Sequence, residues 1–286
     1  MAHRTIRSGH QQLVARLNRF PQGAPPSDVL YGILKMLFSE REAGLVALLP
    51  IKPFTVQKAA QTWKMDPADA QRVLDELAGR AILLDVMGSQ GQQRYVLPPP
   101  MAGFFEFSMM RIRGDVDQKV LGELYYQYMN VEEEFIKTLF THGETQLGRV
   151  FVQEAALSRD NALHVLDYER ASEVIKTASQ RGISLCYCRH KMEHVGRACD
   201  APMNICMTVG GVAASLSKHD FAREVDVAEG LDLLQQAQDH HLVQFGENVR
   251  QDVAFICNCC GWCCVAMIAT RRGGWLRPVL ASNCVR

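Results

Sequence analysis

The stretch Cys257-Asn258-Cys259-Cys260-Gly261-Trp262-Cys263-Cys264 places five cysteines within eight residues. A second group begins upstream with Cys186-Tyr187-Cys188-Arg189 and continues with Cys199 and Cys206. Together with Cys284 these are all ten cysteines of the 286-residue chain, so everything before residue 186 is free of thiols. Such density indicates inorganic ligands and confines the expected function to a C-terminal module.

Composition predicts a soluble globular protein. Hydrophobic residues make up 48% of the chain, which is enough for a substantial core. The formal net charge is zero, from 31 basic and 31 acidic residues, so the whole chain has no excess suited to nucleic acid. No apolar run is long enough to span a membrane, and the first residues do not form an apolar secretory signal. We therefore expect a cytoplasmic protein, in which clustered cysteines indicate metal or cluster ligation rather than disulfides.

Residues 1–27 are predicted to form a basic N-terminal arm, because several arginines precede the first acidic residue, Asp28. Apolar residues recur in this range at near-helical spacing. That pattern is typical of an amphipathic docking arm, a targeting segment or a solvated first helix. The arginines are Arg4, Arg7, Arg16 and Arg19.

Residues 28–100 are predicted to form a winged-helix-like domain. Thr55 and Asp66 each stand where an N-cap begins a helix. Two strand-like segments, 81–86 and 93–97, follow with a glycine-containing turn between them.

A winged helix would bind DNA through its second helix. Here that helix carries more acids than bases, whereas phosphate contact requires the opposite balance. We therefore expect structural or docking use, with DNA binding as the alternative. The acids are Asp66, Asp69, Asp75 and Glu76, and the bases are Arg72 and Arg80.

Pro98-Pro99-Pro100 is predicted to be a stiff spacer that ends this domain. Residues 101–182 are predicted to form a helical linker or docking region, whose aromatic and methionine side chains pack in a helical core or against a partner subunit. Residues 183–286 carry the cysteines among short helices and strands. The predicted fold class is therefore α+β and mostly helical.

The first cysteine group has the spacing C-x-C-x10-C-x6-C over Cys186, Cys188, Cys199 and Cys206. It supplies four thiolates from one loop, which is the number that a [4Fe-4S] cube needs. Zinc also takes four thiolates, but its usual C-x2-C or C-x4-C pairs do not occur among these four. The spacing therefore favours iron–sulfur ligation and makes 183–286 an iron–sulfur module.

Basic side chains lie among these cysteines with few acids between them. Such side chains lower the pKa of thiols and stabilise the charge that a reduced cluster gains. We therefore expect them to tune the cluster. They are Arg189, His190, Lys191 and Arg197.

The cysteines of 257–264 cannot all bind one cube, because a cube has four corners. One plausible set is Cys257, Cys260 and Cys263, at C-x2-C-x2-C, with Cys284 as a distant fourth ligand. This arrangement matches the ligand run of ferredoxins and predicts a second cluster.

Cys259 and Cys264 are alternative ligands, so the ligand choice in this run stays open. Trp262 is predicted either to shield a cluster from solvent or to be an ordinary buried tryptophan.

No acid follows Asp252, and the basic residues after it make a rim suited to an acidic redox partner or an anion. The rim residues are Arg271, Arg272, Arg277 and Arg286.

These motifs resemble the ferredoxin-like 4Fe-4S binding iron–sulfur proteins of anaerobic bacteria and archaea. The resemblance implies an electron-transfer subunit with one or two [4Fe-4S] clusters rather than an independent catalyst. Proteins of that family often have a cysteine where Trp262 stands and continue into a ferredoxin domain, which implies here a truncated chain or a partner that supplies the next cluster. The likeness covers 186–191, 199–207 and 256–264 and, less specifically, 98–110, 117–134 and 143–151.

The first functional hypothesis is therefore an iron–sulfur protein that passes single electrons to or from a ferredoxin, a flavoprotein or a larger oxidoreductase complex. An alternative is an iron–sulfur redox-sensing winged-helix transcriptional regulator. A third is a catalytic cluster in which one iron lacks a protein thiolate and binds substrate. The sequence has neither a Rossmann glycine fingerprint nor a Walker lysine motif.

Overall fold

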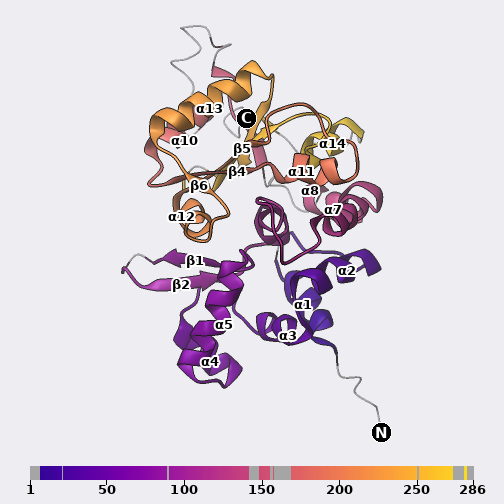
Figure 1. Ribbon diagram of the computed structural model, residues 1–286, viewed down its shortest axis with the longest axis vertical. Helices are drawn as coiled ribbons and strands as arrows, with labels where there is room; N and C mark the ends of the chain where they lie inside the picture. Colours follow the sequence, from indigo (N-terminus) through magenta and orange to yellow (C-terminus); the bar gives the residue numbers. More distant parts are fainter. Residues whose placement is uncertain are drawn as a thin grey trace.

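The structure is a computed structural model, and its mostly helical α+β class agrees with the prediction. Helices of the N-terminal half lie at one end, and a sheet with its flanking helices lies at the other (Figure 1). Within the described ranges, no helix is both long and apolar enough to cross a membrane. The structure describes residues 7–20, 22–88, 90–141, 148–154, 157, 169–249, 251–272 and 280–281.

The N-terminal half consists of helices followed by a two-stranded antiparallel hairpin. A Ser, Thr or Asp side chain before each helix accepts a backbone N–H from its first turn. The predicted N-caps Thr55 and Asp66 are among them and are confirmed. Phe54 forms an isolated antiparallel bridge with Tyr95 beside the hairpin. The elements are α1 (Gly9–Leu17), α2 (Asp28–Leu37), α3 (Glu40–Ala47), α4 (Val56–Trp63), α5 (Pro67–Gly79), β1 (Leu84–Met87) and β2 (Gln93–Val96).

Within the range predicted to be a basic arm, α1 is part of the core. Leu13 and Leu17 are fully buried, and α1 packs against α3. Arg16 is buried as well, and its guanidinium donates to the carbonyl oxygens of Leu49 at 3.4 Å and Pro50 at 2.7 Å. Burial lowers the pKa of Arg16 to about 10. One of the arginines expected on the surface therefore fastens α1 to the chain after α3.

The middle segment forms a helical core. Phe105 is fully buried, and its ring packs against those of Phe104, Tyr125 and Phe135. The chain after Pro100 is kinked rather than regularly helical, because Met101 is extended and Ala102 has a left-handed conformation. The elements are η1 (Pro100–Phe104), α6 (Phe105–Phe107), α7 (Gln118–Tyr126), η2 (Gln127–Val131) and α8 (Glu134–Thr141).

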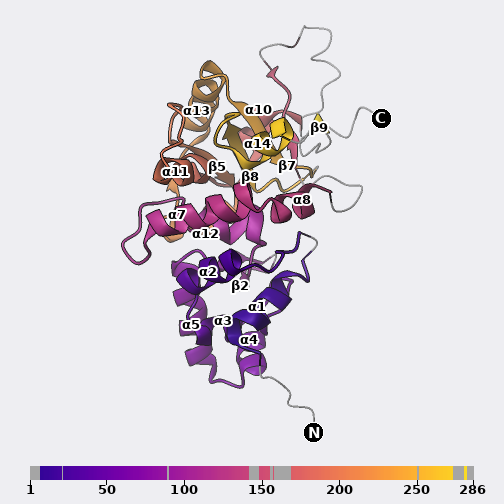
Figure 2. The same cartoon turned by 90° about the vertical axis from the view of Figure 1, so that its right-hand side faces the viewer.

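The C-terminal half is a sheet with the strand order β6-β4-β5-β8-β7-β3-β9, antiparallel except for the β3–β9 pair. α10 and α13 lie on one side of it, and α11 and α14 lie on the other (Figure 1). α7 contacts α2 below and α11 above, and Figure 2 shows it between the N-terminal helices and the sheet. The elements are β3 (Gly148–Val150), α10 (Ala171–Thr177), β4 (Arg181–Leu185), α11 (Tyr187–His194), β5 (Asn204–Val209), α12 (Gly210–Lys218), β6 (Arg223–Glu224), α13 (Val227–Asp239), β7 (Val243–Glu247), β8 (Phe255–Cys259), α14 (Val265–Arg272) and β9 (Leu280–Ala281).

A buried carboxylate joins the hairpin to α12. The side chain of Asp85 is 2% exposed, and it accepts hydrogen bonds from Ser215 Oγ at 2.6 Å and from Lys218. His219 Nε2 lies 3.1 Å from the same carboxylate. Burial raises the pKa of this carboxyl, but the hydrogen bonds from Lys218 and Ser215 outweigh burial and leave the pKa below its ordinary value.

We expect Asp85→Asn to lower the free energy of unfolding at neutral pH by about 2 kcal/mol, because charge-assisted hydrogen bonds are lost. A lowered folded-state pKa stabilises the fold above the ordinary value of 3.8, and this stabilisation is lost as the pH falls through the folded-state pKa. The difference between wild type and variant in urea unfolding should therefore vanish in strong acid. Asp232→Asn, at an exposed position of α13, is the control, and equal stability of wild type and Asp85→Asn at neutral pH would contradict the link.

Candidate metal centre

The structure describes nine cysteines, all of them free thiols. They lie at the start of α11, in the loop after it, in β5, and along the segment from β8 to α14. The predicted ligand Cys284 lies outside the described residues. The candidate site is therefore assembled at one side of the sheet from segments far apart in the sequence.

Sheet register brings the two sequence groups of cysteines together. β5 and β8 are antiparallel neighbours in which Met207 pairs with Ile256. Cys206 and Cys257 are therefore the next pair along these strands, and they project from the face of the sheet opposite to that of Met207 and Ile256. Cys259 projects to the same face as Cys257, because side chains alternate along a strand.

Six thiols interact with one another, five through hydrogen bonds and Cys186 through charge, and we call them the inner set. Cys257 accepts hydrogen bonds from the thiols of Cys206 and Cys259, and these lower its pKa to about 5. Cys264 accepts from Cys188 and Cys259, which hold its pKa well below the ordinary range. Cys257 and Cys264 therefore each contact two other thiols of the group. The inner set is Cys186, Cys188, Cys206, Cys257, Cys259 and Cys264.

Two helix N-termini face the inner set. Cys186 is the N-cap of α11, and the nearby backbone N–H and charge of Arg189 act to lower the pKa of its thiol. Cys264 immediately precedes α14, and its sulfur accepts the backbone N–H groups of Met267 and Ala266. Burial nevertheless raises the pKa of Cys186 to about 11. Because helix N-termini carry partial positive charge, this position suits an anionic group bound to the thiols.

Cys199, Cys260 and Cys263 form a second group, the outer set, whose sulfur atoms all lie within 4.8 Å of one another. The sulfurs of Cys199 and Cys260 are 3.4 Å apart. The backbone N–H of Cys263 donates to Cys260 Sγ at 3.2 Å, and that of Cys199 donates to Cys263 Sγ at 3.3 Å. The thiol of Cys263 lowers the pKa of Cys260 to about 4.

Arg189 lies between the two sets. Its side chain is among the most deeply buried of the described residues, and it donates to the carbonyl oxygens of Pro202 at 3.1 Å and Asn258 at 2.9 Å. Burial lowers the pKa of Arg189, but the charges of Cys186 and of the outer set raise it above its ordinary value. Its Nε is buried and has no hydrogen-bond partner among the described residues. Arg189 therefore interacts with thiols of both sets, and its tuning of a cluster stays a prediction.

Lys191 is fully buried beside the inner set. Its Nζ donates to Asn130 Oδ1 at 2.7 Å, which links α11 to the middle segment. Burial lowers the pKa of Lys191, and the charges of Cys188 and Cys264 oppose that effect. The fold therefore places a buried amine near the thiolates of the inner set.

A carboxyl group that sequence reasoning missed also lies near the inner set. Burial raises the pKa of Glu106 to about 7, and the charge of Cys257 contributes to the rise. Its Oε2 accepts the backbone N–H of Gly103 at 3.1 Å. A signal existed in the sequence, because Glu106 is the one acid within Phe104-Phe105-Glu106-Phe107.

Two other predicted tuning residues are held by the middle segment. His190 Nδ1 lies 2.7 Å from the carbonyl oxygen of Met109. Arg197 donates to the hydroxyl of Tyr126, and its guanidinium lies over that ring. The hydrogen bonds of these two side chains thus go to the middle segment and, for His190, also to His194.

Trp262 is 65% exposed, so the prediction of a buried tryptophan is wrong, whereas shielding of a cluster stays a prediction. The tight turn after β8 projects the indole into solvent, where the guanidinium of Arg271 lies 4.1 Å from the ring centroid. Arg272 donates to the carbonyl oxygen of Asn130 at 2.8 Å. The other residues predicted for the basic rim, Arg277 and Arg286, lie outside the described residues.

The structure groups the thiols differently from their order along the chain, and the predicted ligand sets stay predictions. Cys199 lies with Cys260 and Cys263, while Cys206 contacts Cys257. Strand pairing is the reason, because β5 beside β8 joins thiols from both groups. The loop after α11 then returns Cys199 to the turn that follows β8.

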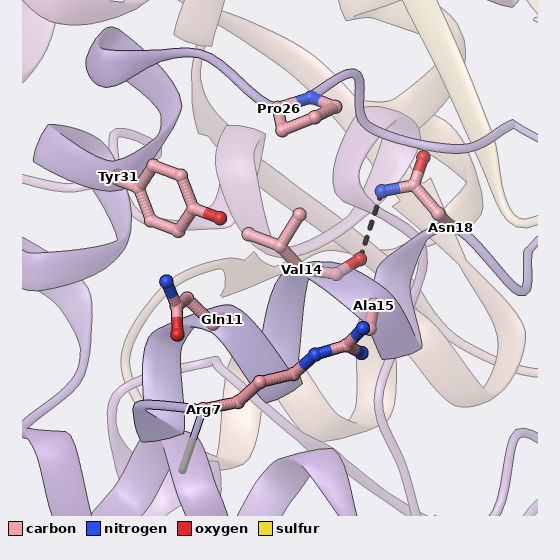
Figure 3. Close-up of a pocket in the computed structure, with 7 residues that line it drawn as sticks. All are labelled: Arg7, Gln11, Val14, Ala15, Asn18, Pro26 and Tyr31. Carbon is pink, nitrogen blue, oxygen red and sulfur yellow. Dashed lines mark hydrogen bonds between the residues drawn. The ribbon is translucent and has the colours of Figure 1, made fainter. Parts of the chain in front are cut away.

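A surface pocket between α1 and the start of α2 contains no thiol or carboxylate (Figure 3). Asn18 is fixed at its edge by a 2.9 Å hydrogen bond from its amide to the Val14 carbonyl oxygen. This lining offers no group suited to metal binding or nucleophilic chemistry. It consists of Arg7, Gln11, Val14, Ala15, Asn18, Pro26 and Tyr31.

Comparison of the chain with family models, curated proteins and solved structures finds no match. The resemblance of the cysteine motifs to ferredoxin-like proteins therefore stays a prediction. The candidate centre is described by its own geometry: six inner thiols, three outer thiols and a buried arginine between them.

Proposed function

We propose that this chain is an iron–sulfur electron-transfer protein or redox subunit, with a [4Fe-4S] cluster bound by the inner set. The observation that carries the proposal is the convergence of six buried or half-buried free thiols, from both sequence groups, at two helix N-termini. Such a cluster, when bound, takes up and releases single electrons. The protein's part is to hold it, exclude water and set its potential.

Charge in the surroundings supports the proposal. Four thiolates around a cluster carry net negative charge, which must be compensated when the site is buried. The guanidinium of Arg189, the buried Lys191 and the N-termini of α11 and α14 all supply positive charge there. The Nε of Arg189, which has no partner among the described residues, is a donor that a sulfide or thiolate of the cluster would satisfy.

The inner set holds more thiols than one cube has corners. Cys257 and Cys264 each contact two other thiols of the inner set, so we propose them as two of the ligands. The other two ligands come from the remaining four thiols of the inner set. This choice replaces the predicted sets, which mixed inner and outer thiols.

Reversible one-electron cycling tests this function. We expect anaerobically purified protein to show visible iron–sulfur absorbance that bleaches with dithionite and returns on reoxidation, because the cluster is buried and fully ligated. Bleaching that cannot be reversed would contradict an electron carrier. Using ferredoxin or flavodoxin as the oxidant tests whether the reduced protein passes electrons to another protein as well as to a small molecule.

The N-terminal half favours a docking role. We propose that α3, the Phe54 bridge, α4, α5 and the β1–β2 hairpin form a winged-helix-like domain, in agreement with their order. On α5, Arg72 is paired with Asp69, and Asp75 accepts hydrogen bonds from Gln71 and the Tyr95 hydroxyl. The acids of α5 would repel DNA phosphates.

Because the order of elements is winged-helix-like, a redox-sensing transcriptional regulator is the second candidate function. Binding of holo-protein to duplex DNA with a steep salt dependence would favour that function over the carrier. We expect no such binding. A cytoplasmic setting suits either function, because free thiols persist in a reducing compartment.

The partner we propose is a redox protein with an acidic docking face. Exposed Trp262 and Arg271 stack on each other beside the outer set. Exposed aromatic and arginine side chains are enriched where proteins bind each other. Ferredoxins, flavoproteins and larger oxidoreductases are the candidate classes.

A further inference from the structure

We propose that Cys199, Cys260 and Cys263 bind a single zinc ion, separate from the iron–sulfur site of the inner set. This inference goes beyond the proposed function and does not depend on it. The outer set is defined by its own geometry, and it would hold zinc whether or not the inner set holds iron. The chain would then carry two metal centres of different chemistry.

Sulfur spacing is the first argument. Thiolates that share one tetrahedral zinc, with Zn–S bonds of about 2.3 Å, lie roughly 3.8 Å from one another. The three sulfurs of the outer set lie within 4.8 Å of one another, and the closest pair is 3.4 Å apart. Among the described residues, this is the one group of three potential ligands whose atoms all lie so close to one another. The outer set therefore has the spacing of ligands to one ion.

Loop geometry is the second argument. Cys260-Gly261-Trp262-Cys263 has the C-x2-C spacing of zinc knuckles, and Cys199 meets it from another loop. Backbone N–H groups donate to two of the sulfurs, to Cys260 at 3.2 Å and to Cys263 at 3.3 Å. Such bonds stabilise thiolates and hold them in place before the metal binds.

Charge is the third argument. Three thiolates and one divalent ion leave a net charge of −1, which needs a positive neighbour in a partly buried site. Arg189 contacts Cys199 and is held in place by two backbone carbonyls. Three protein ligands leave the fourth tetrahedral position to a ligand other than the described cysteines. Cys199 and Cys260 are partly exposed, so the outer set lies near the protein surface.

Metal analysis of the anaerobically purified full chain tests the inference. We expect about one zinc per chain in the wild type, and a fall of about tenfold or more in Cys260→Ser and in Cys263→Ser. Iron should be retained in both variants. Cys257→Ser/Cys264→Ser, in the inner set, should lose iron and keep zinc, and circular dichroism reports whether each variant is folded.

X-ray absorption at the zinc edge of the wild type tests the same point without any substitution. We expect Zn–S distances of about 2.3 Å with sulfur as the main ligand. Wild-type protein without zinc would overturn the inference, as would zinc that Cys260→Ser and Cys263→Ser both retain, or iron that both lose. Zinc at the outer set in protein without iron would support this inference and contradict the proposed function.

Discussion

Cys257→Ser/Cys264→Ser is expected to reduce the iron of anaerobically purified protein about tenfold or more. Each of these sulfurs contacts two other thiols of the inner set, so their loss breaks the connected group at two places. They also come from different elements, β8 and the N-terminus of α14. The remaining thiols then lack the two ligands that connect them. Iron and acid-labile sulfide per chain measure the effect.

The matched control changes the same number of cysteines in the outer set. Cys199→Ser/Cys260→Ser should keep the iron and sulfide of the wild type, because these thiols lie outside the connected inner group. Full iron in the inner-set variant, or equal loss in both variants, would show that the division into inner and outer sets is wrong. A folded far-ultraviolet spectrum is required of each variant before its metal content is compared.

Lys191→Met is expected to lower the midpoint potential of the proposed cluster by roughly 60 mV or more. Reduction adds negative charge, and a nearby buried ammonium stabilises the reduced state. Lys191 is fully buried, and its charge interacts with those of Cys188 and Cys264. Methionine fills a similar volume without charge. Its introduction therefore removes more electrostatic stabilisation from the reduced cluster than from the oxidised one. Potentiometric titration measures the shift.

Lys176→Met is the matched control, because this lysine is exposed and lies on α10, on the other side of the sheet. Its loss should leave the potential unchanged. Lys191→Arg keeps the charge and should retain most of the wild-type potential if it folds. A potential that stays constant in folded Lys191→Met would contradict the role of the buried amine.

Much of the N-terminal half could be predicted from local sequence. Thr55 and Asp66 act as N-caps because a short side-chain oxygen before a helix satisfies a free backbone N–H wherever the chain places it. The strand-like segments around the 88–91 turn pair as a hairpin, because close partners in the sequence need no long-range register. Burial of Arg16 and the packing of α1 depend on tertiary contacts with the end of α3, which local charge and periodicity do not reveal.

The density of cysteines in the sequence identified the candidate ligands. It did not reveal how they divide into an inner and an outer set. Spacing along the chain groups Cys199 with Cys206, whereas the pairing of β5 with β8 joins Cys206 to Cys257. Register between strands separated by about fifty residues is a long-range property that spacing cannot supply. The exposure of Trp262 has the same origin, because it depends on which way the turn after β8 faces.

Iron, acid-labile sulfide and the EPR spectrum of reduced, anaerobically purified wild-type protein test the central claim most directly. The account predicts about four irons and four sulfides per chain, with a reduced-state signal from one cluster. Zinc without iron would contradict electron transfer at the inner set. About eight irons would contradict the separation of the outer set from iron–sulfur ligation.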